Sequence, residues 1–221
     1  MLGTTIHAAL EKMYQPLLIG QKVNNFNRIW ETFMSNLKNE LLSHNDFKNI
    51  VSTGKQILQD YYKFYYQKEY KLISLERNFG NTYYLLFNNF PIKGKIDRLD
   101  YLDEKNKTVM VVDYKTGKPK TQKEVEQGIS SQWSEKEKNL SLNIRGGYKR
   151  QLLFYKLLSD LDKSFTFKAV EGCLDFVQLN FSKKFRPIKI NFLDTDMSEF
   201  KNLLKEITSE IKSLKFLETN D

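Results

Sequence analysis

Two stretches set the expected fold: Gly94-Lys95-Ile96-Asp97-Arg98, and Val111-Val112-Asp113-Tyr114-Lys115-Thr116-Gly117-Lys118. Both lie in short segments that are rich in β-branched and aromatic residues and are bounded by turn residues, a pattern typical of strands. Side chains alternate between the two faces of a strand, so Asp113 and Lys115 share one face and Tyr114 lies on the other. The second stretch therefore presents an acid and an amine side by side.

The position of Asp97 relative to Asp113 depends on the turn between the two strands. A hairpin that turns about residue 105 places both carboxylates on the same face. A turn centred half a residue earlier places them on opposite faces, unless a β-bulge corrects the register. A site shared by the two acids therefore requires the turn about residue 105 or a bulge that corrects the register.

The segments on either side predict an α/β fold. Residues 1–69 carry apolar stripes at helical spacing, with Thr4 or Thr5 as a candidate cap of the first helix. The order of elements predicts a mixed central sheet flanked by helices, with an N-terminal helical part. The expected strands cover residues 71–79, 83–90, 92–102 and 108–116 as a β-meander, and lie near 169–180 and 187–192; the expected helices cover 123–128, 148–161 and about 196–216, the last capped by Asp194 or Thr195.

Residues 129–143 form a polar segment that contains Trp133. Such a segment is either a loop over a site or an ordinary insertion, and the sequence leaves both open.

Composition excludes several classes of protein. The chain has 221 residues and a single cysteine, Cys173, so it can hold neither an internal disulfide nor a multi-cysteine metal site. One cysteine also indicates a reducing compartment, and we expect the cytoplasm. No apolar run reaches the ~20 residues of a membrane helix, and the start lacks the order of a signal peptide. Because residues 1–5 lead almost at once into a helix, we expect a piece of a longer polypeptide.

The net charge favours an anionic partner. Lys and Arg number 35 against 27 Asp and Glu, a formal charge of +8. Two converging carboxylates require a counter-cation, and oxygen ligands with open water positions suit Mg²⁺ or Mn²⁺. Such an ion can activate a water molecule and stabilise charge on a phosphate, while Lys115 positions or deprotonates the water or neutralises the phosphate. The alternative is a charged strand end at which Asp113 and Lys115 are merely solvated.

Five stretches in order resemble the motifs of PD-(D/E)XK nucleases, and in particular the RecB-like branch found at the C-termini of UvrD/Rep-type helicases and in AddAB subunits. The two stretches above resemble the core motif. The other three are Gly3-Thr4-Thr5-Ile6-His7-Ala8-Ala9-Leu10-Glu11, Ser74-Leu75-Glu76-Arg77-Asn78-Phe79 and Gln151-Leu152-Leu153-Phe154-Tyr155.

The resemblance implies a restriction-endonuclease-like fold and a function. The chain would be one RecB-like domain over residues 1–221, with a helical part at 1–69 and a nuclease core with a C-terminal helix at 70–221. It would be a divalent-metal-dependent DNA nuclease, of exonuclease type, from a helicase–nuclease of recombination or repair. Its cofactor would be Mg²⁺ or Mn²⁺. Its partners would be DNA, single-stranded at the active site, and a helicase portion of the same or a partner chain, with no membrane.

The resemblance also assigns the catalytic residues. His7, Asp97, Asp113 and the backbone carbonyl of Tyr114 would bind the metal. Asp97 and Asp113 would form the catalytic set together with Lys115, the catalytic lysine.

Further residues are implied to support the site. Gln151 and Tyr155 lie one helical turn apart and would contact the phosphate backbone or orient the site. Glu11 shares a helix face with His7 and would hold its imidazole ring. Glu76 would help the metal site or simply pair with Arg77 or a lysine.

Basic residues in segments that flank the site are candidates for phosphate contacts. A solvated face is the alternative for each of them. The candidates are Lys95, Lys118, Lys149 and Arg150.

The sequence departs from the family pattern in three ways. Ile96 stands where the family motif names a proline, and Cys173 alone cannot hold the four-cysteine iron–sulfur cluster of some relatives. No Gly-x-x-x-x-Gly-Lys-Ser/Thr loop is present, so the chain lacks that route to ATP. A rival interpretation is a non-catalytic nucleic-acid-binding or scaffold domain that keeps the nuclease fold.

Overall fold

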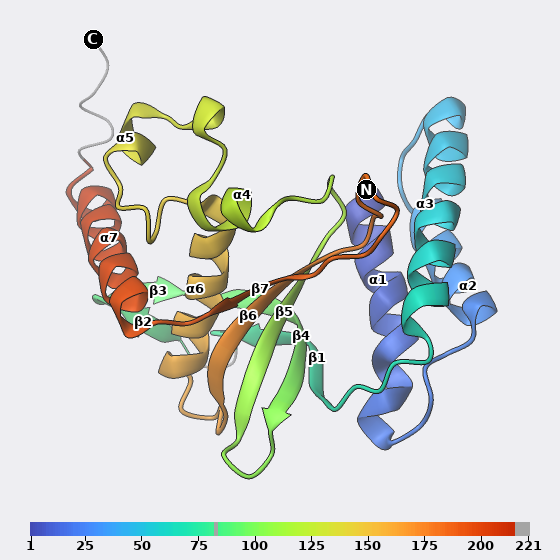
Figure 1. Ribbon diagram of the computed structural model, residues 1–221, viewed down its shortest axis with the longest axis horizontal. Helices are drawn as coiled ribbons and strands as arrows, with labels where there is room; N and C mark the ends of the chain where they lie inside the picture. The colour runs from blue at the N-terminus through green and yellow to red at the C-terminus, as the bar shows by residue number, and fades with distance from the viewer. Residues whose placement is uncertain (82–83, 215–221) are drawn as a thin grey trace.

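A five-stranded sheet forms the centre of the computed structural model, which describes residues 1–81 and 84–214 (Figure 1). The strand order is β1-β4-β5-β6-β7. Neighbouring strands are antiparallel except for β5 and β6, which are parallel. The predicted mixed sheet is therefore confirmed. The strands are β1 (Leu72–Phe79), β4 (Gly94–Asp103), β5 (Thr108–Lys115), β6 (Lys168–Phe176) and β7 (Ile188–Asn191).

Helices cover both faces of the sheet, as the sequence predicted (Figure 1). One apolar core joins the N-terminal helices to Val112 and Tyr114 of β5, and another joins α6 to Val109 and Val111 on the opposite face of the same strand. The last helix, α7, packs against α6. The helices are α1 (Leu2–Tyr14), η1 (Gln15–Ile19), α2 (Phe26–Lys38), α3 (His44–Tyr65), α6 (Gly147–Leu161) and α7 (Asp194–Ser213).

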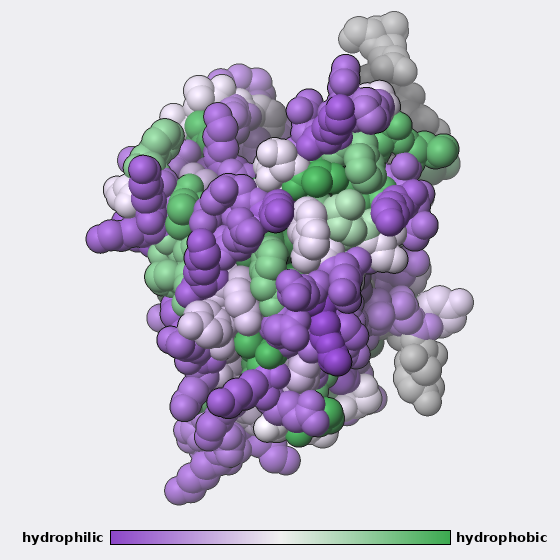
Figure 2. All heavy atoms as spheres, turned by 90° about the vertical axis from the view of Figure 1, so that its right-hand side faces the viewer, coloured by the Kyte–Doolittle hydropathy of each residue, from purple (hydrophilic) through white to green (hydrophobic). Residues whose placement is uncertain are grey.

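Local sequence explains the N-terminal helical part. The side chains of Asn25 and Ser43 accept backbone N–H groups in the first turns of α2 and α3, which caps both helices. Gly54 of α3 lies against the Phe33 ring of α2, and a Cβ there would be only 2.2 Å from that ring. Figure 2 looks onto this side of the molecule, where hydrophilic side chains dominate and hydrophobic ones lie in small groups. The helices thus bury their apolar stripes inward.

The predicted helix caps at both ends of the chain are wrong. The hydroxyl groups of Thr4 and Thr5 donate to the carbonyl of Met1, the residue that precedes α1, so both threonines lie inside the first turn. Helix α7 begins at Asp194 itself and follows Leu193, so neither Asp194 nor Thr195 caps it. The predicted end of this helix at residue 216 lies outside the described residues.

The predicted strand at 83–90 exists only in part and does not belong to the central meander, and residue 83 itself lies outside the described residues. β2 (Leu85–Phe87) and β3 (Phe90–Ile92) form a separate hairpin, and β1 pairs directly with β4. Asn88 and Asn89 have φ values of 52° and 56°, which asparagine tolerates better than most residues. They form the two-residue turn that reverses the chain.

The polar segment around Trp133 has local structure of its own. Capping boxes at Thr121 and Ser134 begin α4 (Gln122–Gln127) and α5 (Glu135–Lys138), with η2 (Ser130–Gln132) between them. These elements lie above the start of α6 in Figure 1.

None of the helices within residues 1–81 and 84–214 has the length and apolar character that crossing a bilayer requires.

Candidate active site

The register of β4 and β5 places the two acids together. Arg98 pairs with Val112 and Leu99 with Val111, so the next position sets Asp97 opposite Asp113. These pairs centre on residue 105, as a shared site requires, whereas the pair Asp103↔Thr108 beside the turn centres half a residue later. The register shift between Tyr101 and Asp103 therefore produces the alignment of the two acids, as a β-bulge does.

Asp97 is the centre of one group of candidate ligands. Its Oδ2 accepts the backbone N–H of Tyr114 at 2.8 Å, which ties β4 to β5 beside the site. Its Oδ1 lies 3.4 Å from Nδ1 of His7 on α1. His7, Glu76 and Asp97 each offer a ligand atom, and these atoms lie within 4.8 Å of one another. One imidazole nitrogen and two carboxylate oxygens are donors that a divalent cation accepts.

Asp113 is held by a second group of side chains on α6. Its Oδ1 accepts the Tyr155 hydroxyl at 2.8 Å and the Gln151 amide at 2.9 Å. Lys115 donates to Oε1 of Gln151 at 2.7 Å, and its Nζ lies 2.7 Å from Oδ2 of Asp113. Gln151 thus positions the acid and the amine at once.

The second oxygen of Asp113 is only partly satisfied. The carboxylate is 3% exposed, and within the described residues Oδ2 accepts no hydrogen bond. Its one charged partner there is the Lys115 ammonium group, whose Nζ lies 2.7 Å away. A buried carboxylate oxygen that faces a cation in this way suits a site of gathered negative charge. The cluster of His7, Glu76 and Asp97 fits a divalent metal, and Asp113 lies outside that cluster.

Two pKa values in the site are shifted upward. Burial lowers the pKa of His7, but the carboxylates of Asp97, Asp113 and Glu76 outweigh burial and raise it. Burial raises the pKa of Asp113; the Lys115 ammonium opposes this shift and the charge of Asp97 adds to it. The raised pKa of His7 reflects the negative charge gathered beside it, whereas the raised pKa of Asp113 reflects chiefly its burial.

Glu76 reaches this cluster through an unusual backbone conformation. Its φ is 48°, although it lies inside β1. For a residue other than glycine this region is sparsely populated and costs energy. The sequence left Glu76 as a helper of the metal site or a partner of Arg77 or a lysine. The structure places its carboxylate beside both Lys95 and the candidate ligands His7 and Asp97. Arg77 lies 3.9 Å from Asp162 instead.

Glu11 and Tyr114 occupy different surroundings. Glu11 lines a cavity of about 550 Å³ together with His7 and Glu76, and burial together with the charge of Glu76 raises its pKa. Among the described side chains, Asp97 rather than Glu11 contacts the His7 ring nitrogen. The Tyr114 ring lies on the other face, where its hydroxyl accepts from Arg98 at 2.8 Å. The ligand role of the Tyr114 carbonyl stays a prediction.

The candidate DNA contacts divide into two kinds. Lys118 is exposed, and Lys95 is exposed beside Glu76. Lys149 is buried with its Nζ 2.7 Å from Asp196 of α7, and Arg150 lies 2.9 Å from Glu137 while it also donates to backbone carbonyls. The last two side chains therefore hold elements of the protein together.

Sequence reasoning missed Tyr148 and left Trp133 in a segment that was either a loop over a site or an insertion. Tyr148 of α6 and Trp133 of the polar segment line a cavity that Gln151 also borders. The periodicity of α6 was the one available signal, because it places Tyr148 one turn before Gln151. Nothing in the sequence related either residue to Trp133.

Comparison with known proteins agrees with this geometry. The sequence matches the family model described as the PD-(D/E)XK nuclease superfamily over residues 1–220. A search of curated proteins finds no significant match. The match spans every element that contributes to the site, from His7 on α1 to Tyr155 on α6. The chain therefore belongs to the PD-(D/E)XK nuclease superfamily.

Proposed function

We propose that this chain is a divalent-metal-dependent deoxyribonuclease of the RecB-like type, which hydrolyses phosphodiester bonds. The observation that carries the proposal is the buried carboxylate of Asp113, whose Oδ2 lies 2.7 Å from the Lys115 ammonium group. An acid and an amine in this state, opposite a second acid, match the needs of metal-assisted hydrolysis. A solvated strand end has no reason to be buried.

His7, Asp97 and Asp113 would hold Mg²⁺ or Mn²⁺, with the Tyr114 carbonyl as a further ligand. The clustering of Glu76 with His7 and Asp97 supports adding its carboxylate to this set. A divalent ion bound there supplies a Lewis acid that acidifies water and stabilises charge on a phosphate.

The protein's own groups prepare the site for a phosphodiester. Lys115 brings a positive charge to the edge of the carboxylates, where it can neutralise a phosphate oxygen or hold the attacking water. Gln151 fixes Lys115 through its carbonyl and Asp113 through its amide, so neither side chain is free to rotate. Tyr155 holds Asp113 from the other side. Lys118 and Lys95 would contact neighbouring phosphates.

The finer assignment rests on the order of the sequence motifs. We propose exonuclease action on single-stranded DNA, in the cytoplasm, as one domain of a helicase–nuclease of recombination or repair. The helicase portion would belong to the same or a partner chain. The formal charge of +8 supports an anionic polymer as substrate.

Cleavage of end-labelled single-stranded DNA tests the proposal. Wild type should cut in Mg²⁺ or Mn²⁺ and not in a chelator. Asp113→Ala and Lys115→Ala should bind DNA and fail to cut, while Lys163→Ala, which removes an exposed lysine outside the site, should cut normally. No cleavage by wild type with any metal, together with undiminished binding by both site variants, would support the scaffold interpretation instead.

A further inference from the structure

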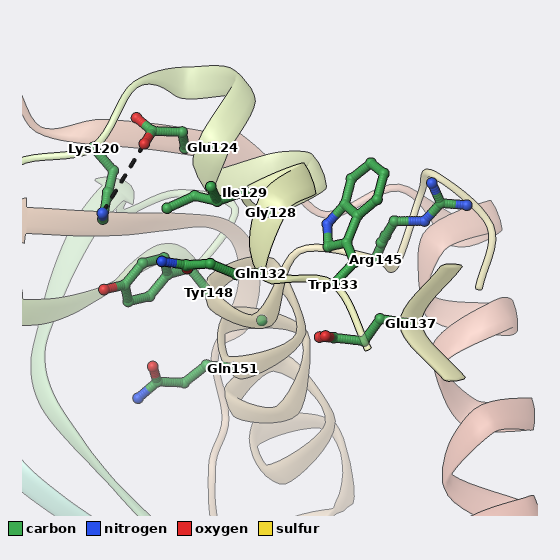
Figure 3. Close-up of a pocket in the computed structure, with 11 residues that line it drawn as sticks. Lys120, Glu124, Gly128, Ile129, Gln132, Trp133, Glu137, Arg145, Tyr148 and Gln151 are labelled. Atoms are coloured by element: carbon green, nitrogen blue, oxygen red, sulfur yellow. Dashed lines mark ion pairs between the residues drawn. The ribbon is translucent and has the colours of Figure 1, made fainter. Parts of the chain in front are cut away.

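A second cavity lies directly beside the candidate active site. It measures about 470 Å³ and is bordered by the segment from Lys120 to Arg145 and by the start of α6 (Figure 3). Tyr148 and Gln151 belong to both places: Gln151 binds Lys115, whose Nζ lies 5.4 Å from the centre of the Tyr148 ring. Figure 3 shows both side chains on the same side of α6. Whatever fills this cavity is therefore a direct neighbour of the Lys115 amine.

Aromatic rings line the cavity and are fixed in place. The Trp133 indole N–H donates to the carbonyl of Gln127 at 3.1 Å, and the Arg145 guanidinium lies 4.5 Å from the ring centre. Gly128 approaches so closely that a Cβ would lie 2.9 Å from the indole nitrogen. Tyr148 packs its ring edge-to-face with Phe176. Trp133 and Tyr148 both remain partly exposed. Rings that serve only the core are usually buried.

The charges around the cavity leave cations available. Arg145 uses its N–H groups on the backbone carbonyls of Leu140 and Lys138, so its charge has no carboxylate partner among the described residues. Lys120 lies 4.0 Å from Glu124, at the limit of an ion pair, whereas Glu137 is paired with Arg150 at 2.9 Å. A cavity of this volume lies within the range for one small ligand. Rings with cations beside them are the features that bind unpaired nucleotides.

We infer that this cavity receives the unpaired base of a nucleotide next to the cleaved phosphate, stacked on Trp133 and Tyr148, with Lys120 near an adjoining phosphate. The inference rests on the proposed function and adds a requirement to it. A base in this cavity cannot remain in a duplex, so the site selects single strands. Stacking accepts any base, because each base has a π-face, so the selection carries no sequence preference.

Removal of the bases, rather than of protein groups, gives the most direct test. We would measure the Kd of the metal-free wild-type chain for oligothymidylate and for an abasic oligonucleotide of the same length and charge, by fluorescence anisotropy in a chelator. Stacking contributes roughly 1–3 kcal/mol per base, so the abasic strand should bind about 5- to 150-fold more weakly. This arm needs no variant and therefore no assumption about folding.

Variants then locate the effect in the cavity. Trp133→Ala should weaken oligothymidylate binding to the abasic level and leave abasic binding unchanged, while Trp133→Phe should keep most of the preference. Tyr84→Ala, which removes an aromatic side chain that is 85% exposed outside the cavity, is the matched control and should change nothing. Thermal unfolding of each variant separates loss of fold from loss of stacking.

The outcomes separate this inference from the proposed function. Equal affinity for the two strands, an unchanged base preference in folded Trp133→Ala, or no binding of single strands by wild type overturns the base site. A chain that cleaves DNA without base preference keeps the function and loses this inference. A chain that prefers bases, through Trp133, yet fails to cleave with any metal keeps the base site and loses the nuclease.

Discussion

Two groups of buried carboxylates lie on opposite faces of the same sheet, and they differ in how their oxygens are satisfied. Burial does not distinguish them: Asp97 and Asp113 are 6% and 3% exposed, and Asp100 and Asp175 are 5% and 2% exposed. We call the first pair with His7, Glu76 and Lys115 the open cluster. The closed cluster lies against the N-terminal helices and consists of Arg98, Asp100, Tyr114, Asp175, Tyr61 and Tyr65.

Every acid of the closed cluster has partners within the protein. Both oxygens of Asp100 accept from Arg98, at 2.9 and 3.1 Å, and Asp175 accepts the hydroxyls of Tyr61 at 2.7 Å and Tyr65 at 3.3 Å. In the open cluster, Oδ2 of Asp113 meets only the partly exposed Lys115 ammonium group among the described residues, and Asp97 lies 3.4 Å from His7. The two pairs of acids are comparably buried, but their oxygens differ in how many hydrogen-bond donors they have within the protein. This difference indicates that the closed cluster serves stability and that the open cluster is built for a ligand. Variants in the two clusters test this division.

Asp113→Asn should give the largest effect, a loss of cleavage on the order of 10³-fold. A bound metal contributes several kcal/mol to the transition state, and each 1.36 kcal/mol is tenfold in rate. The same change removes a buried like charge beside Asp97, so the free energy of unfolding should stay equal or rise. Single-turnover cleavage and urea unfolding measure the two quantities. A large loss of stability would place Asp113 with the structural acids.

Arg98→Met should destabilise the fold by about 3–5 kcal/mol, because it leaves the carboxylate of Asp100 buried without its partner. Lys115→Met is the matched change in the open cluster. Asp113 stays buried but keeps hydrogen bonds from Gln151 and Tyr155. The Lys115 side chain is 20% exposed, so we expect a smaller cost of about 1–3 kcal/mol and a loss of cleavage. Urea unfolding of both variants checks the pair. Equal costs would break the comparison.

Tyr155→Phe should lower Mn²⁺ affinity about 10- to 100-fold, since it removes a hydroxyl that orients a ligating carboxylate. Its cost in stability should be about 1 kcal/mol, as for one hydrogen bond. Calorimetric titration with Mn²⁺ measures the affinity. Tyr101→Phe, which removes a hydroxyl outside the site, is the control; if it matched Tyr155→Phe, the role assigned to the Tyr155 hydroxyl would be wrong.

Asp175→Asn should give the smallest effect, a change in how stability depends on pH. Burial raises the pKa of Asp175, against the opposing influence of Arg98 and the two tyrosine hydroxyls. The folded protein therefore holds more protons between the unfolded value of about 3.9 and the folded value, and the free energy of unfolding falls as pH rises through that window. Urea unfolding from pH 4 upward should show this fall weakened in the variant.

Asp103→Asn supplies the opposite sign as a control. The N–H groups of Asn106 lower the pKa of Asp103, so this acid stabilises the fold above its unfolded pKa and loses that contribution as pH falls. If both variants changed the pH dependence in the same direction, the assignment of Asp175 to a burial-dominated cluster would fail.

The sequence was sufficient to predict the fold class and to state what the β4–β5 hairpin must do for Asp97 and Asp113 to share a face, because both depend on local periodicity. Alternation on β5 defined the face of Asp113, but the register shift between Tyr101 and Asp103, which the sequence offered only as an alternative, brings Asp97 opposite it. The strand at 83–90 failed because consecutive asparagines can continue an extended chain or reverse it, and the choice depends on the partner strand. The parallel pairing of β5 with β6 left no local signal either.

The candidate site was less accessible from sequence. Lys149 was offered as a DNA contact, although helix geometry separates its direction from that of Gln151 by about 200°. It forms an ion pair with Asp196 of α7 instead. The backbone of Glu76 and the contact of Trp133 with Arg145 depend on tertiary packing, which a single sequence does not reveal. His7 was reached only through resemblance to a family.

The parallel pairing of β5 with β6 also orders events during synthesis on the ribosome. Asp175 lies on β6, and the chain delivers the tyrosines of α3 and Arg98 of β4 well before it. Until β6 emerges, the tyrosine hydroxyls have no Asp175 carboxylate to donate to. The apolar side of the N-terminal helices is then not yet covered by β6. The nascent chain is therefore expected to stay loosely packed and dependent on chaperones until α6 has been made and β6 can dock.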